Sequence, residues 1–252
     1  MLPILPTSSS DIYRLFLKAE AEWARPLAEE FPLDAGTAFI NRKLPDTWDA
    51  NHLRDGCIPT GSSAAQVVGD VDRFFAEHNS RCAYYVTQDQ TLIDHLLASG
   101  YRADAFEIHL LRDHRPEPAQ VPPDLKIIPA RASYRHAREI LGDVRVLHLD
   151  DPHFECLLAL RESKAIACAG LLTIGEIGYI TEVHVTADHR RQGTGRLMLN
   201  HLLDLCSRAQ LRHILLDVRS DNHPAKSLYH DLGFRKVCDH TVYRAPWTAE
   251  PR

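Results

Sequence analysis

The sequence predicts an α/β fold in which a mixed, mostly antiparallel central sheet is flanked by helices, with two such domains in tandem. Three observations support this expectation. Short segments of alternating apolar residues are interleaved with segments of helical leucine spacing, a proline-rich segment divides the chain, and the two halves share a faint internal repeat.

The elements are clearest after residue 124. We expect a strand at 125–129, a helix at 133–141, and strands at 154–161, 165–173 and 179–185. A helix, a strand at 211–218, a short helix and two final strands follow. Residues 113–124 carry four prolines and are expected to be a linker. The expected domains are therefore residues 1–112 and residues 125–252.

The composition is that of an ordinary globular protein. Of the 252 residues, 44% are hydrophobic and 25% are charged, and the net charge is −5. The acidic balance argues against a nucleic-acid surface, and no apolar run is long enough to cross a bilayer. The first residues lack the pattern of a signal peptide, so we expect a cytoplasmic protein that binds neither nucleic acid nor membrane. Six scattered cysteines are expected to be reduced, and no spacing favours a metal site.

Gly193 and Gly195 lie between an alternating apolar segment and a helix with leucines at helical spacing. Glycine lets backbone approach a ligand closely, and the N–H groups of a first helical turn attract phosphate oxygens. Arg190, Arg191 and Arg196 add positive charge. The segment therefore predicts a phosphate-binding turn, and two glycines that serve only turn geometry are the alternative.

A second motif follows the strand at 211–218. Asn222 stands at a helix start with a proline near the first helical position, and Tyr229 lies in the short helix that Gly233 ends. On local grounds, Asn222 could simply cap the helix and Tyr229 could simply pack in the core.

Together these motifs resemble the signatures of the GNAT acetyltransferase superfamily over about residues 125–246. The resemblance implies an acetyl-coenzyme A-dependent N-acetyltransferase, with the pyrophosphate on the glycine loop and Tyr229 near the departing thiol. It also implies main-chain contacts from the strand that precedes the loop. The implied cofactor-binding residues are Val183, His184, Val185, Arg190, Arg191, Gln192, Gly193, Thr194, Gly195, Arg196, Asn222 and Tyr229.

Acetyl transfer to an amine needs a base for the amine proton and an acid for the departing thiolate. Glu182 is the first candidate for the base because partial burial on the strand would raise the pKa of its carboxyl group. His184 is the alternative or the partner, and ordered water is a third possibility. Tyr229 is the candidate acid. No Ser-His-Asp or Cys-His arrangement is visible, so we do not expect a covalent acyl-enzyme.

The amino-terminal half contains a faint copy of this plan. Gly100 and Gly233, each followed by an aromatic residue, lie 133 residues apart. At that offset the site residues are replaced by Cys57, Thr60, Ser62, Asp89 and Leu96. We therefore expect residues 1–112 to form a degenerate GNAT-like domain and residues 125–252 to form the catalytic one.

The acceptor is expected to be a primary amine of a small molecule or amino-acid derivative. Acetylation of a protein N-terminus or lysine is the alternative within the same class. A non-catalytic sensor of acyl-coenzyme A is the alternative from another class. The sequence does not indicate an oligomeric state.

Overall fold

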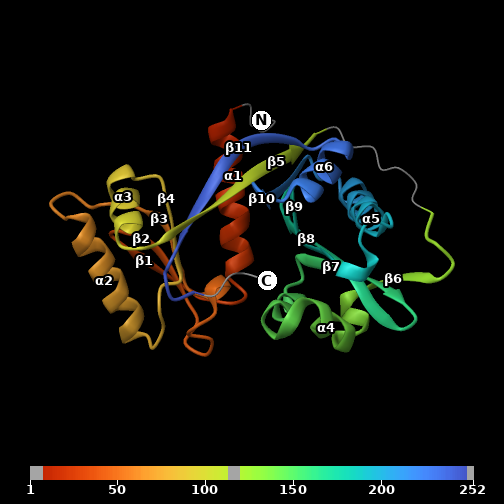
Figure 1. The fold of residues 1–252 in the computed structure, drawn as a ribbon, viewed down its shortest axis with the longest axis horizontal. Coiled ribbons are helices and arrows are strands. Elements are labelled where there is room, and N and C mark those ends of the chain that lie inside the picture. The colour runs from red at the N-terminus through yellow and green to blue at the C-terminus, as the bar shows by residue number, and fades with distance from the viewer. Residues whose placement is uncertain (1–7, 113–119, 249–252) are drawn as a thin grey trace. The chain divides into compact units, whose positions relative to one another are not determined.

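The computed structural model describes residues 8–112 and 120–248, which fall into two compact units (Figure 1). Unit 1 comprises the described residues within Met1–Trp23 and Glu107–Cys238. Unit 2 comprises those within Ala24–Phe106 and Asp239–Arg252. These units differ from the linear division at residues 113–124, part of which (113–119) lies outside the described residues. The units differ from that division because two ten-residue strands contribute residues to both of them. These strands are β5 (Arg102–Leu111) and β11 (Arg235–Arg244).

Unit 1 is built on a mixed sheet with the hydrogen-bonded order β5-β10-β9-β8-β7-β6. Pairing is antiparallel from β6 to β9, and β9 and β10 are parallel. Besides β5, its strands are β6 (Leu125–Pro129), β7 (Phe154–Arg161), β8 (Lys164–Ile174), β9 (Ile177–Val185) and β10 (His213–Arg219). Its helices are α1 (Ser9–Ala24), η2 (Ala130–Ala132), α4 (Tyr134–Arg145), η3 (Val146–Asp150), η4 (Ala187–His189), α5 (Thr194–Arg208) and α6 (His223–Asp231).

Each face of the unit 1 sheet has its own hydrophobic core. Successive residues of β10 alternate between them, so that Ile214 and Leu216 pack with α5 while Leu215 packs with α1 and α4. Tyr179 on β9 belongs to the α1 and α4 side, where it contacts Phe16 edge-on. The two faces define the α5 side and the α4 side of the sheet, names used from here on.

Most elements expected after residue 124 are present. The strands at 125–129 and 154–161 have the expected bounds, and the helix expected at 133–141 continues to Arg145. Gly142, with φ 82° and ψ 175°, interrupts that helix directly after the expected end. The expectation of two final strands is wrong, because residues 235–244 form the single long strand β11.

Unit 2 repeats the plan with the strand order β1-β2-β3-β4-β11. Its first four strands are β1 (Glu29–Leu33), β2 (Gly36–Ile40), β3 (His52–Gly56) and β4 (Tyr84–Thr87), and β3 and β4 are parallel. Its helices are η1 (Trp48–Ala50), α2 (Ala64–Glu77) and α3 (Gln90–Ala98). One core joins α2 and α3 to the sheet, with Phe75 and Tyr85 among its largest buried side chains.

The internal repeat is real but not uniform. Asp89 caps α3 by accepting a hydrogen bond from the N–H of Leu92, and Asn222, 133 residues later, caps α6 in the same way. The offset changes upstream, because α2 begins at Ala64 and α5 at Thr194. Gly193 therefore corresponds to Ser63, and its expected correspondence with Thr60 is wrong by three residues.

Candidate functional site

The parallel strands β9 and β10 part inside unit 1. Their register covers only Ile177–Tyr179 against His213–Leu215. Beyond it, β9 continues to Val185 and β10 continues to Arg219. The main chain of Ile180–Val185 that faces away from β8 thus lies past the end of the ladder with β10. Such backbone groups need other hydrogen-bond partners, which a bound ligand can supply.

A β-bulge lies on the same stretch of β9. The register with β8 shifts between Cys168 and Gly170, and Glu182 adopts a left-handed φ of 54°. Ile180, Val183 and Val185 all pack against the α5-side core. The extra residue therefore leaves Glu182 and His184 on the α4 side, together with Tyr179. A regular strand would have placed Val183 there instead.

Glu182 is partly buried and ion-paired. Its Oε2 lies 3.2 Å from a guanidinium nitrogen of Arg145, which comes from the last turn of α4. The Glu182 side chain is 9% exposed and the Arg145 side chain is 32% exposed, so water reaches the pair from the arginine side. The first candidate for the base is thus held by a cation whose position the sequence analysis did not predict.

His184 is more accessible than Glu182. Partial burial, together with the nearby Arg190 and Arg145 guanidinium groups, lowers the pKa of its imidazole below the ordinary value of 6.5. Its ring is therefore neutral at physiological pH and can accept a proton.

The glycine loop leads into a helix that has no side-chain cap among the described residues. Gly193, with φ 80°, is the N-cap of α5, and its carbonyl accepts the first helical hydrogen bond from the N–H of Leu197. The N–H groups of the first turn, at Thr194, Gly195 and Arg196, are left for a ligand. In unit 2 the corresponding helix α2 is closed by a capping box between Ser63 and Gln66.

Three of the predicted loop side chains contact the protein itself. Arg190 donates to the carbonyl of Val185 (2.9 Å), Gln192 donates to the carbonyl of Asp188 (3.0 Å), and Arg196 pairs with Asp231 (2.9 Å). These contacts hold the loop to β9 and α5 to α6. Arg191 is exposed and makes no ion pair with any described residue, which leaves its charge for an anion.

Gly193 and Gly195 serve different purposes. A Cβ at Gly193 would meet nothing within 4 Å, so glycine is favoured there by its positive φ alone. A Cβ at Gly195 would lie 3.3 Å from Leu228 Cδ2 of α6, so this glycine allows close helix packing.

Tyr229 of α6 is buried beside Phe234. Burial and the nearby Asp217 carboxylate raise the pKa of its phenol above the ordinary value of 10. Asp217, on the part of β10 beyond the ladder, also accepts a hydrogen bond from Tyr179 (2.8 Å). Tyr229 and the end of β10 therefore share one neighbourhood.

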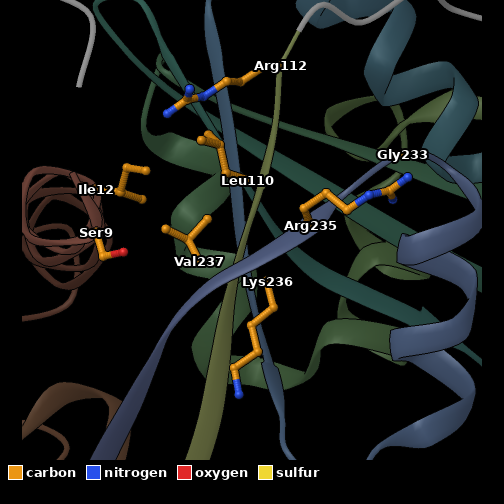
Figure 2. A pocket seen from close by; sticks show the side chains of 8 residues that line it. All are labelled: Ser9, Ile12, Leu110, Arg112, Gly233, Arg235, Lys236 and Val237. Carbon is orange, nitrogen blue, oxygen red and sulfur yellow. The ribbon is translucent and has the colours of Figure 1, made fainter. Parts of the chain in front are cut away.

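A pocket of about 460 Å³ in unit 1 includes none of the predicted site residues (Figure 2). Ile12, Leu110 and Val237 supply its apolar lining. Arg235 donates to the carbonyl oxygens of His230 and Phe234, and Lys236 pairs with Glu107. Figure 2 shows these two basic side chains pointing in different directions. The pocket is thus separate from the predicted site.

Among residues 8–112 and 120–248, no three His, Cys, Asp or Glu side chains lie close enough together to hold a metal ion. Within the same ranges, no helix combines the length and the apolar character needed to span a membrane. No disulfide joins the six cysteines, all of which are described.

Comparisons with known proteins agree with this architecture. Residues 120–234 match the acetyltransferase (GNAT) family. A GCN5-related N-acetyltransferase from Kribbella flavida superposes with a TM-score of 0.66 at 13% identity, covering 96% of this chain and 97% of that one. A tandem GNAT protein from the clavulanic acid biosynthesis pathway gives a TM-score of 0.51 at 15% identity, covering 72% of this chain and 69% of that one.

One relative by sequence comes from Bacillus subtilis and is provisionally named a ribosomal protein bS18 alanine N-acetyltransferase. It is 25% identical over 87 residues, which are 34% of this chain and 58% of that protein. The chain thus spans less than two thirds of this relative's length.

The structure is an α/β protein with two units of related plan, and its fold is similar to that of solved GNAT proteins. The family match covers residues 120–234, which are less than half of the chain. The predicted family and the predicted mixed, mostly antiparallel fold are confirmed.

A charge at the start of α5 tests the phosphate site. Aspartate and asparagine both tolerate a left-handed φ, and the space around Gly193 is open, so Gly193→Asp and Gly193→Asn are expected to fold. The aspartate places a negative charge where phosphate oxygens should lie. We expect it to weaken coenzyme A binding at least 100-fold in calorimetry, and the asparagine to weaken it far less.

Ser62→Asp in unit 2 is the matched control, because that exposed residue lies beside a helix that Ser63 already caps. The Ser62→Asp variant should bind coenzyme A with the affinity of the wild type. If the folded Gly193→Asp variant bound coenzyme A as tightly as the wild type does, the start of α5 would not be the phosphate site.

Proposed function

We propose that this chain is an acetyl-coenzyme A-dependent N-acetyltransferase that transfers an acetyl group to a primary amine by direct attack in a ternary complex. The observation that carries the proposal is the uncapped glycine start of α5 beside the parted strands β9 and β10. Both features lie in the segment that matches a family whose acyl donor is acetyl-coenzyme A.

The residues of unit 1 fit this donor. The N–H groups of Thr194, Gly195 and Arg196, with the Arg191 side chain, offer a cationic cradle for a pyrophosphate. The main chain of Val183 and Val185, past the ladder with β10, offers hydrogen bonds to an extended arm. When bound, acetyl-coenzyme A supplies a thioester carbonyl that an amine can attack.

His184 is the base that the geometry favours. The attacking amine must lose a proton, and the His184 imidazole is neutral at physiological pH, accessible, and on the α4 side of the bulge. Glu182, the first candidate from the sequence, is instead engaged with Arg145. We assign Glu182 the role of fixing α4 against the bulge.

Tyr229 is the proposed proton donor to the departing sulfur. Its raised pKa keeps the hydroxyl protonated throughout the physiological range. Asn222 uses its carbonyl oxygen to cap α6 at 3.3 Å from the N–H of Ala225, which leaves its amide N–H₂ for the pantetheine arm.

Unit 2 is proposed to be inactive toward acetyl-coenzyme A. Its parallel pair re-forms after a bulge at Asp55, so that Gly56 pairs with Thr87 at the ends of both strands. The Thr87 hydroxyl also donates to the Gly56 carbonyl (2.5 Å). The strands therefore stay together where β9 and β10 part, and Ser63 occupies the start of α2.

A small-molecule amine or amino-acid derivative is the proposed acceptor. The name of the Bacillus subtilis relative makes a protein N-terminus the second candidate. Incubating the protein with acetyl-coenzyme A and measuring release of thiol tests both, with small amines and amino acids in one arm and alanine-initiated peptides in the other. Turnover only of peptides would reject the small-molecule acceptor. Tight donor binding without turnover of any amine would favour a sensor.

Tyr229→Phe separates chemistry from packing. The variant keeps the contact with Phe234 and removes the proton donor. We expect turnover to fall by a factor on the order of 10²–10⁴ with little change in acetyl-coenzyme A affinity. Steady-state rates and thermal unfolding on the same variant measure this. Unchanged turnover with lowered stability would make Tyr229 a structural residue.

His184→Gln and Glu182→Gln identify the base. If His184 takes the proton, its glutamine variant loses turnover by about 10²-fold or more, while Glu182→Gln loses much less. Since the His184 pKa is lowered, the neutral ring persists below pH 6.5. In the wild type, kcat should therefore fall only in more acidic solution, as the ring gains a proton. A larger loss of turnover in Glu182→Gln than in His184→Gln would indicate that the Glu182 carboxylate is the base.

A further inference from the structure

We propose that Cys168 is a positioning residue whose thiol, by donating a hydrogen bond to the main-chain carbonyl of Glu182, holds the bulge that turns Glu182 and His184 toward α4. The inference deepens the proposed function and rests on it for its catalytic consequence. Its structural part stands on the geometry of β8 and β9 alone.

The thiol lies at the bulge itself. Cys168 Sγ is 3.1 Å from the Glu182 oxygen, and Cys168 is 1% exposed. In the same register, the main chain of Cys168 lies opposite His184, and the shift follows between Cys168 and Gly170. One residue of β8 thus contacts the bulged residue with its side chain and the candidate base with its backbone.

The bulge needs a specific contact to persist. Glu182 carries a Cβ and adopts a left-handed φ, a conformation that costs free energy for any residue other than glycine. Regular pairing would relieve that strain, but it would turn Val183 toward α4 and Glu182 toward α5. The thiol remains a donor, because burial and the nearby Cys156 and Glu182 raise the pKa of Cys168 well above its ordinary value.

Cys156 provides a matched control. It lies on β7 in the same α4-side core and is also 1% exposed. Its thiol contacts the carbonyl of the adjacent Leu157 at 3.8 Å and the main chain of Ala169, and it makes no hydrogen bond to the Glu182 carbonyl. Removing the sulfur from either residue opens a space in the same core, but only the loss at Cys168 removes a hydrogen bond to the Glu182 carbonyl.

The first measurement is kinetic. We expect Cys168→Ala to lower kcat about tenfold, Cys168→Ser to retain kcat within about twofold because it keeps a donor, and Cys156→Ala to retain it likewise. Cys168→Val fills the space without a donor and should behave as Cys168→Ala does, which covers the case in which the alanine variant fails to fold. Equal kcat values for Cys168→Val, Cys156→Ala and the wild type would overturn the proposal.

The second measurement does not depend on activity. NMR titration of the His184 ring, assigned with His184→Gln, reports the burial of the ring and its distance from Arg190 and Arg145. We expect the lowered pKa to return toward 6.5 in Cys168→Ala and Cys168→Val, and to stay low in Cys168→Ser and Cys156→Ala. An unchanged His184 titration in all four variants would reject the positioning role. Failure of the wild type to bind acetyl-coenzyme A or acetylate any amine would instead reject the proposed function.

Discussion

The separation of β9 from β10 after the pair Tyr179 and Leu215 is the constraint on which the rest of the candidate site depends. Parallel strands in a sheet ordinarily satisfy each other's backbone groups, so a stretch that stops pairing must find other partners. Unit 1 opens that stretch beside an uncapped helix start. Unit 2 has a bulge at the equivalent place but closes its strands again at Gly56 and Thr87. The same strand arrangement can therefore leave backbone groups of a parallel pair without strand partners, as in unit 1, or pair them again, as in unit 2.

The sequence predicted much of unit 1. The alternation of β7 and the leucine spacing of α5 are local patterns with one structural solution, and both elements lie where expected. The bulge is reflected in the spacing of the apolar residues of β9. Ile180, Val183 and Val185 share the α5 side although the first step between them is three residues, where a regular strand requires two.

Other features had no local signal. The contact between Arg145 and Glu182 joins residues 37 positions apart through the packing of α4 on the sheet, and nothing near either residue indicates it. The same holds for the Cys168 thiol on Glu182. The roles assigned to Glu182, His184 and Tyr229 remain predictions, because position alone does not report proton transfer.

The two long strands β5 and β11 bear on how the chain reaches its fold. Unit 2 needs residues 239–244, since Tyr243 pairs with Tyr85 and packs in its core. Those residues are synthesised after all of unit 1. During most of translation, the sheet of unit 2 therefore lacks its strand β11. A fragment cut at residue 112 would keep that open sheet edge permanently, which makes it prone to aggregation. Because β11 contributes residues to both units, unit 2 completes its sheet only once the chain has been synthesised past unit 1.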